Sequence, residues 1–371
     1  MTDGLPRRRS RAIRRLPLIA IGFLSGAWGV WLGLIRVGWR LPLPWPDQLI
    51  AHGPLMIGGF LGTVIALERA VALGSGWAYL APLTTAAGAV LLVLGPPGPT
   101  GPLLFTLGSL LVVLILVIVS WRQPALFLLT MAAGAIAWLA GNLQWISGGA
   151  ISRVVLWWIA FLVLTIAGER LELNRVLRPT RAVRATFTIA MALILMGAAS
   201  RVVWPAWGVR CFGGGLLLLT TWLVRHDVAR HTVRQRGLTR FMAVCLLAGY
   251  VWLGVGAIVA MVSGAASNGV VYDAMLHAWL LGFVMSMIFA HAPIILPAVL
   301  AVRLDYRPSF YAHLLLLHVS VAVRLAGDLV EDLGRWRAWG ALLNAMALLM
   351  FVANTARSIH AGVAAGRAAN T

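Results

Sequence analysis

Long apolar blocks recur along the whole chain, and they constrain its fold more than any other feature. A helix needs roughly 20 apolar residues to cross the hydrocarbon core of a bilayer. Backbone polar groups cannot stay unpaired there, and the chain lacks the alternating pattern of a membrane β-barrel. We therefore predict an all-α, polytopic transmembrane helical bundle of about twelve helices. The expected spans are 16–38, 48–70, 77–95, 102–121, 125–146, 151–168, 186–203, 205–224, 241–263, 271–299, 309–329 and 338–356.

The composition excludes a soluble protein, because 61% of the residues are hydrophobic and only 11% are charged. We expect one integral membrane domain over 1–371, with a short basic cytoplasmic N-terminus (1–15) and a cytoplasmic tail (357–371). The net charge of +19 comes from arginines that lie between apolar blocks. They indicate topology signals and contacts with a lipid bilayer, and no nucleic-acid partner is expected.

The arginines alternate between the two sides of the predicted bundle. The loops 169–184 and 225–240 hold five arginines each, whereas 96–101 and 264–270 hold none. Arginine-rich loops stay on the cytoplasmic side of a membrane. With twelve spans, both termini are then cytoplasmic.

A short repeat marks the second and sixth predicted helices. Residues 66–70 read ALERA and residues 167–171 read AGERL, each where its helix leaves the membrane. The repeat suggests three arcs of four helices, with the second, sixth and tenth helices in equivalent places. We interpret both Glu-Arg pairs as anchors at the membrane surface.

Five of the eight histidines fall inside predicted helices, where an ionisable side chain is costly and marks a candidate functional site. His52 and His277 lie roughly 6–9 Å below the outer surface, whereas His291, His313 and His318 lie in the inner half. At α-helical geometry His277 and His291 point to one face. We expect His291 to face His318, and water near the headgroups to satisfy His313.

Imidazoles on different helices at one depth are typical ligands of haem iron or copper, although they could also relay protons. We predict that His52 and His277 hold one haem iron or copper together, and that His291 and His318 are further metal ligands. The structural alternative is a neutral histidine bonded to a nearby backbone carbonyl.

Two charged residues lie near the end of the eleventh predicted helix. Arg324 and Asp328 are four residues apart, so we expect an intrahelical ion pair. The alternative makes Arg324 a cofactor-binding residue that contacts a haem propionate or another anion.

Three segments around these histidines have a family likeness. They read AHGPLMIGGFLGTVIALERAVAL (51–73), HAWLLGFVMSMIFAHAPIILPAVL (277–300) and LLLLHVSVAVRLAGDL (314–329). They resemble the NnrS family of bacterial haem- and copper-containing membrane proteins, which is linked to nitric oxide metabolism and protection from nitrosative stress. The resemblance implies the bacterial inner membrane, haem with copper as a second candidate, and metal-associated roles for His52, His277 and His291, with His318 as a further candidate.

The pair His52-Gly53 also opens the second predicted helix, and in this it is similar to the catalytic subunit of haem–copper oxidases. Between Gly53 and Arg225 the chain has no histidine, and the tenth helix lacks an HxH pair. The oxidase copper ligands are therefore missing. This more distant resemblance implies a haem scaffold rather than oxygen reduction.

Three classes of function follow from these observations. The leading hypothesis is a haem protein, with copper as a second cofactor, that binds or converts a small redox ligand such as nitric oxide. The alternatives are a transporter with an intramembrane His, Arg and Asp path for protons or substrate, and a non-enzymatic membrane sensor or assembly factor.

The arginine bias gives a testable topology. Reporter fusions after Arg184 and after Gly269 should report opposite sides of the membrane, with Arg184 on the cytoplasmic side. The same side at both positions would contradict the twelve-span arrangement.

Overall fold

The computed structural model describes residues 14–95, 98–264 and 267–368, and these residues form helices and no strand. Twelve helical segments among them are long and apolar enough to cross a membrane, which confirms the predicted all-α transmembrane bundle. They are Leu16–Arg36, Pro46–Leu73, Gly76–Leu94, Thr100–Arg122, Leu126–Ile146, Ile151–Leu177, Arg181–Ser200, Pro205–His226, Gly237–Ser263, Gly269–Leu300, Phe310–Leu329 and Glu331–Gly362.

The two predicted termini differ in what the structure describes. Most of the N-terminal segment 1–15 lies outside the described residues. The last helix continues to Ala368, so most of the predicted tail 357–371 is helical. The tail is rich in alanine and has no proline, and alanine is the strongest helix former.

The chain divides into two compact units. Unit 1 comprises Met1–Ile115, His291–His313 and Leu348–Thr371, and unit 2 comprises Leu116–Ala290 and Leu314–Ala347. Among the five histidines of the predicted spans, unit 1 therefore holds His52, His291 and His313, whereas unit 2 holds His277 and His318.

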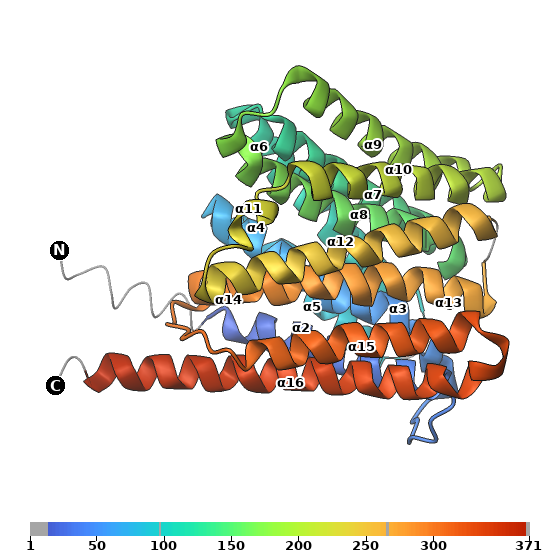
Figure 1. The fold of residues 1–371 in the computed structure, drawn as a ribbon. Helices are drawn as coiled ribbons and strands as arrows, with labels where there is room; N and C mark the ends of the chain where they lie inside the picture. The colour runs from blue at the N-terminus through green and yellow to red at the C-terminus, as the bar shows by residue number, and fades with distance from the viewer. Residues whose placement is uncertain (1–13, 96–97, 265–266, 369–371) are drawn as a thin grey trace. The chain divides into compact units, whose positions relative to one another are not determined.

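Unit 1 begins with helices from the N-terminal third of the chain (Figure 1). They are α2 (Leu16–Arg36), η1 (Pro46–Ala51), α3 (His52–Pro54), η2 (Leu55–Gly62), α4 (Thr63–Leu73), η3 (Gly76–Tyr79), α5 (Leu80–Leu94) and the first part of α6 (Thr100–Arg122). Unit 1 also contains most of α14 (Ser286–Leu300), the start of α15 (Phe310–Leu329) and the end of α16 (Gly334–Ala368). Within it, α2 packs against α4, α5 and η2.

Glycines on α2 let the second span approach closely. A Cβ atom at Gly26 would lie 3.1 Å from the Phe60 ring, and one at Gly29 would lie 2.8 Å from the Met56 sulfur. In a membrane the lipid is as apolar as the helices, so the hydrophobic effect does not drive helices together. Small residues instead let two helix backbones approach closely and pack. The second span therefore packs closely against α2 at these glycines.

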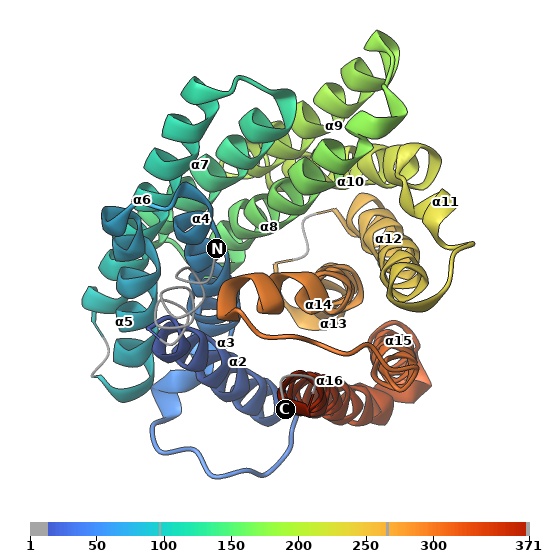
Figure 2. The ribbon, with the colours of Figure 1, turned by 90° about the vertical axis from the view of Figure 1, so that its left-hand side faces the viewer.

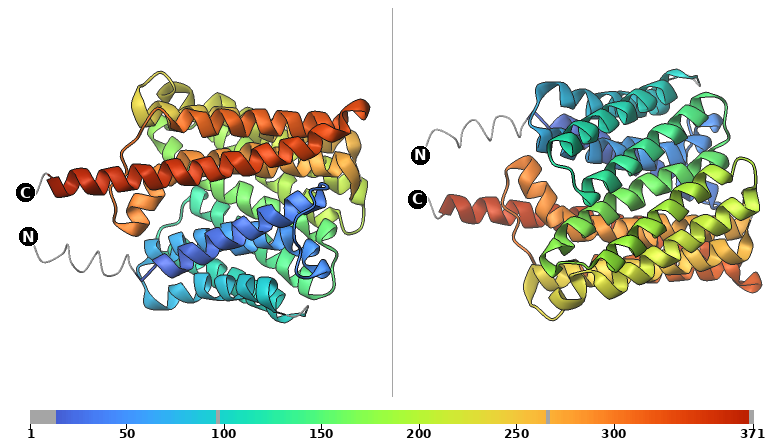
Figure 3. Two further views of the ribbon diagram at one scale, coloured as in Figure 1. Left: turned by 90° about the horizontal axis from the view of Figure 1, so that it is seen from below. Right: turned by 90° about the horizontal axis from the view of Figure 1, so that it is seen from above.

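Unit 2 is built from helical hairpins. Its helices are α7 (Leu126–Ile146), α8 (Ile151–Leu173), η4 (Asn174–Leu177), α9 (Arg181–Ser200), α10 (Pro205–His226), α11 (Ala229–Thr232), α12 (Gly237–Ser263), α13 (Gly269–His277), η5 (Ala278–Met285), η6 (Glu331–Leu333) and parts of α6, α14, α15 and α16. The view in Figure 2 shows α10 between α9 and α12, and it packs on both. Figure 3 shows α15 beside α16, and these two helices contribute the last segment of unit 2, Leu314–Ala347.

The α9–α10 hairpin depends on a close approach of two backbones. A Cβ atom at Gly215 would lie 2.7 Å from the backbone nitrogen of Ile194, and one at Gly197 would collide with the backbone of Phe212. The neighbouring Gly214 faces open space, with no described atom within 4 Å of a Cβ placed there. Two adjacent glycines therefore have opposite environments.

These glycines give a matched pair of variants. Gly215→Ala should lower the free energy of unfolding by about 1–3 kcal/mol, because the added methyl group overpacks the hairpin. Gly214→Ala should leave the melting temperature unchanged or raise it slightly, since alanine favours the helix. Thermal unfolding in detergent measures both, and an equal loss in the two variants would contradict the close packing.

Candidate functional site

Two of the predicted site histidines lie next to π-helical segments. His52 opens α3 and is followed after Pro54 by the π-helix η2, whereas His277 ends α13 and is followed at once by the π-helix η5. The π-helix is rare and is frequently found at functional sites. Its turns hold more residues than α-helical turns, so the α-helical argument that His277 and His291 share one face no longer applies.

The two π-helices also share a sequence pattern. Gly59-Phe60 and Gly282-Phe283 occupy the same fifth and sixth positions of η2 and η5. The predicted likeness of the second and tenth helices therefore extends to their local structure. The sixth span is α-helical over Ile151–Leu173 and does not share the feature. The arrangement in three arcs stays a prediction.

The imidazole of His52 is held against α2. Its Nδ1 lies 2.7 Å from the backbone oxygen of Gly29. A Cβ atom at Gly33 would lie 2.9 Å from the ring carbon Cε1, so only glycine leaves room for the ring there. Because a carbonyl oxygen only accepts, Nδ1 donates the hydrogen and a neutral ring carries its lone pair on Nε2.

His277 is held in the same way by its own helix. Its Nδ1 lies 2.8 Å from the backbone oxygen of Asp273 and 3.3 Å from the Asp273 carboxylate. The neutral ring therefore also carries its lone pair on Nε2. Both rings therefore make the backbone-carbonyl bond of the structural alternative, and a metal-binding histidine usually donates its other N–H in the same way. They belong to different units, so their sharing of one metal stays a prediction.

The other predicted histidines have different surroundings. The indole Nε1 of Trp252 donates to Nδ1 of His318 at 2.9 Å, so a neutral His318 carries its hydrogen on Nε2. His313 is fully buried and its Nδ1 lies 3.1 Å from the Asn354 amide, so the expectation that headgroup water satisfies it was wrong. His291 lies on α14 in unit 1. The metal-binding roles of His291 and His318, and their facing each other, stay predictions.

Arg324 does not form the expected intrahelical ion pair. Its Nη2 and Nε atoms donate to Oδ2 of Asp273 on α13, at 2.7 and 3.1 Å. The expectation was wrong because a carboxylate on a neighbouring helix accepts two partly buried bonds from the guanidinium. Asp328 instead lies 3.8 Å from Nε of Arg337 on α16. A cofactor-binding role for Arg324 stays a prediction.

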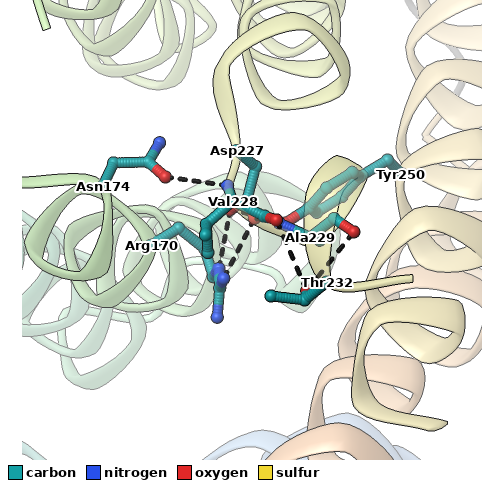
Figure 4. A network of polar contacts seen from close by, with 7 residues as sticks. All are labelled: Arg170, Asn174, Asp227, Val228, Ala229, Thr232 and Tyr250. Carbon is teal, nitrogen blue, oxygen red and sulfur yellow. Dashed lines mark hydrogen bonds and ion pairs between the residues drawn. The ribbon is translucent and has the colours of Figure 1, made fainter. Parts of the chain in front are cut away.

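A second ion pair involves the arginine-rich loop 225–240 (Figure 4). Arg170 on α8 donates through Nε and Nη2 to the two oxygens of Asp227, at 2.7 and 3.0 Å. The same carboxylate accepts from the Tyr250 hydroxyl at 3.0 Å and from the backbone N–H of Ala229 at 2.7 Å. Four hydrogen bonds therefore satisfy one buried carboxylate and connect α8, α12 and the loop.

Arg170 was predicted to be an anchor at the membrane surface, and that interpretation was wrong. It is only 2% exposed, because the loop folds back and places the fully buried Asp227 beside it. Asn174 strengthens the same connection by accepting from the backbone N–H of Val228 at 2.9 Å. A signal was available, since Asp227 is the one acidic residue in the stretch 225–240.

Breaking this ion pair should be costly. Asp227→Asn or Arg170→Gln should destabilise the protein by about 3–5 kcal/mol, because each leaves one buried charge without its partner. Arg175→Gln is the matched control, since its pair with Glu172 lies exposed where α8 is followed by η4. Thermal unfolding measures all three, and a control as unstable as the Asp227 variant would show that the pair contributes nothing special.

Within the described parts of the chain, no group of three or more His, Cys, Asp or Glu side chains could hold one metal ion. A haem iron needs only one or two axial ligands from the protein. His52 and His277 each provide one candidate ligand.

The fold and these buried polar groups define a multi-pass helical membrane protein. The chain belongs to a family that is described as "Domain of unknown function (DUF8744)", whose model matches residues 15–360. No curated protein matches the sequence.

Proposed function

We propose that the chain is a haem-binding protein of the bacterial inner membrane, with copper as a second candidate cofactor and both termini in the cytoplasm. Its role would be to bind or convert a small redox ligand such as nitric oxide, as the resemblance to the NnrS family implies. One observation carries the proposal. His52 and His277 each tie Nδ1 to a backbone carbonyl beside a π-helix.

The hydrogen bonds at Nδ1 would serve ligation in two ways. They hold each ring in one orientation and leave the lone pair on Nε2, the atom that would meet the iron. A donated hydrogen bond also makes the imidazole more basic, which strengthens a metal bond. When bound, haem would supply an iron that changes oxidation state and takes a small ligand.

Glycines provide the room that such a site needs. Gly33 on α2 admits the His52 ring, and Gly53 follows His52 without a side chain that could obstruct a flat macrocycle. Gly282 in η5 similarly admits Trp252, because a Cβ atom there would collide with the indole. Near both histidines, therefore, a neighbouring ring lies so close to a glycine that a larger residue would collide with it.

A transporter is the second candidate. It is favoured by the charged groups that α13, α15 and α16 hold in unit 2, since ionisable residues in membrane helices mark substrate or proton paths. A protein that is colourless and takes up no haem would support this class.

An absorption spectrum tests the haem proposal directly. Protein purified from haem-supplied cells should show a Soret band, and His52→Ala or His277→Ala should abolish or shift it, because each removes a candidate axial ligand. His231→Ala is the matched control, since this histidine lies exposed in the arginine-rich loop. Full haem retention in both single variants, or a wild-type protein without haem, would contradict the proposal.

A further inference from the structure

Three arginines are buried among the described residues, and one of them differs from the other two in its partners. Arg170 and Arg324 each donate two hydrogen bonds to a carboxylate, that of Asp227 and that of Asp273 respectively. Arg201 directly follows α9 in unit 2 and is only 6% exposed. Its buried Nη1 atom has no hydrogen-bond partner in the described part of the chain, and no ion pair reaches its guanidinium there. No described residue therefore neutralises this buried positive charge.

The turn between α9 and α10 buries its charged side chain and exposes its apolar ones. Val203 and Trp204 are exposed, as is Trp207 in the first turn of α10, whereas Arg201 beside them is buried. An arginine at a membrane surface usually extends its charged head towards water, and Arg210 on α10 is exposed in this way. Arg201 therefore does not have the environment of a surface anchor.

Close packing holds the backbone of Arg201 in place. A Cβ atom at Gly208 on α10 would lie 2.5 Å from both the backbone nitrogen and the Cα atom of Arg201. The backbone N–H of Arg201 also donates to the carbonyl oxygen of Gly197 in the last turn of α9, at 3.3 Å. An arginine beside a helix end can donate to the last carbonyl groups, but within the described ranges Nη1 makes no such bond. The guanidinium is thus fixed at a place where it needs an acceptor.

We propose that Arg201 binds a small planar oxyanion, such as nitrate or a carboxylate, whose oxygens accept hydrogen bonds from the guanidinium. A buried charge without a partner is costly, and an arginine cannot remove its charge by losing a proton, because it stays protonated in proteins. The donors of the planar guanidinium form a fork that matches two oxygens of such an anion. One bound oxyanion therefore supplies both the counter-charge and the acceptor for Nη1.

The site lies at the end of α9 that is remote from the arginine-rich loop 169–184. This loop leads directly into α9, and the 20 residues of the helix span about 30 Å before Arg201. A dissolved anion would therefore reach Arg201 from the side of the membrane opposite to that loop. The site does not depend on haem, because it uses neither His52 nor His277.

Thermal unfolding in the presence of two oxyanions tests the proposal, because a ligand that binds only the folded protein raises its melting temperature. The purified wild-type protein in detergent is dialysed into sodium chloride. The chloride is then replaced stepwise by sodium nitrate, or by sodium acetate in a separate titration, at constant ionic strength. In at least one titration the melting temperature should rise and then level off as the site fills.

Three variants assign the effect to the guanidinium. Arg201→Gln should abolish the rise, and Arg201→Lys should need an anion concentration about tenfold higher for half of it, because lysine keeps the charge but loses one hydrogen bond of the fork. Arg210→Gln is the matched control and should retain the wild-type curve, since Arg210 is exposed on the same hairpin and donates to the Met261 carbonyl. A flat wild-type curve in both salts, or a rise that survives in Arg201→Gln, would overturn the proposal. Size-exclusion elution confirms that each variant is folded.

Discussion

The bilayer's inability to pair backbone polar groups is the constraint on which the rest of the structure depends. It makes every span helical and leaves close packing, rather than the hydrophobic effect, to bring the helices together. Gly215 and Gly340 show the result, because each faces a neighbouring backbone so closely that a methyl group would not fit. Such contacts fix the positions of the helices, and the helices in turn determine where the few polar side chains lie.

The departures from regular α-helix coincide with the histidines. His52 and His277 each stand beside a π-helix and bond through Nδ1 to a backbone oxygen, one on a neighbouring helix and one on its own. A π-helix is a less favourable backbone conformation than an α-helix, so it persists only where the surrounding structure holds it in place. Two such segments with a shared Gly-Phe pattern indicate a common local design in the second and tenth spans.

The sequence predicts the helices well because span length and apolarity follow directly from bilayer thickness. It predicts side-chain partners poorly, because those depend on packing between distant segments. The spacing of Arg324 and Asp328 favours a local pair, yet Asp273 on another helix binds the guanidinium. Arg170 is covered by the loop that carries Asp227, and hydropathy does not predict how such a loop folds.

Ferric haem added to the purified protein, followed by low-temperature electron paramagnetic resonance, tests most directly whether these histidines are haem ligands. Neutral imidazoles with the lone pair on Nε2 predict stoichiometric uptake and the low-spin signal of iron with nitrogen axial ligands. A protein that leaves the haem unbound, with only the signal of free ferric haem, would contradict the assignment of His52 and His277.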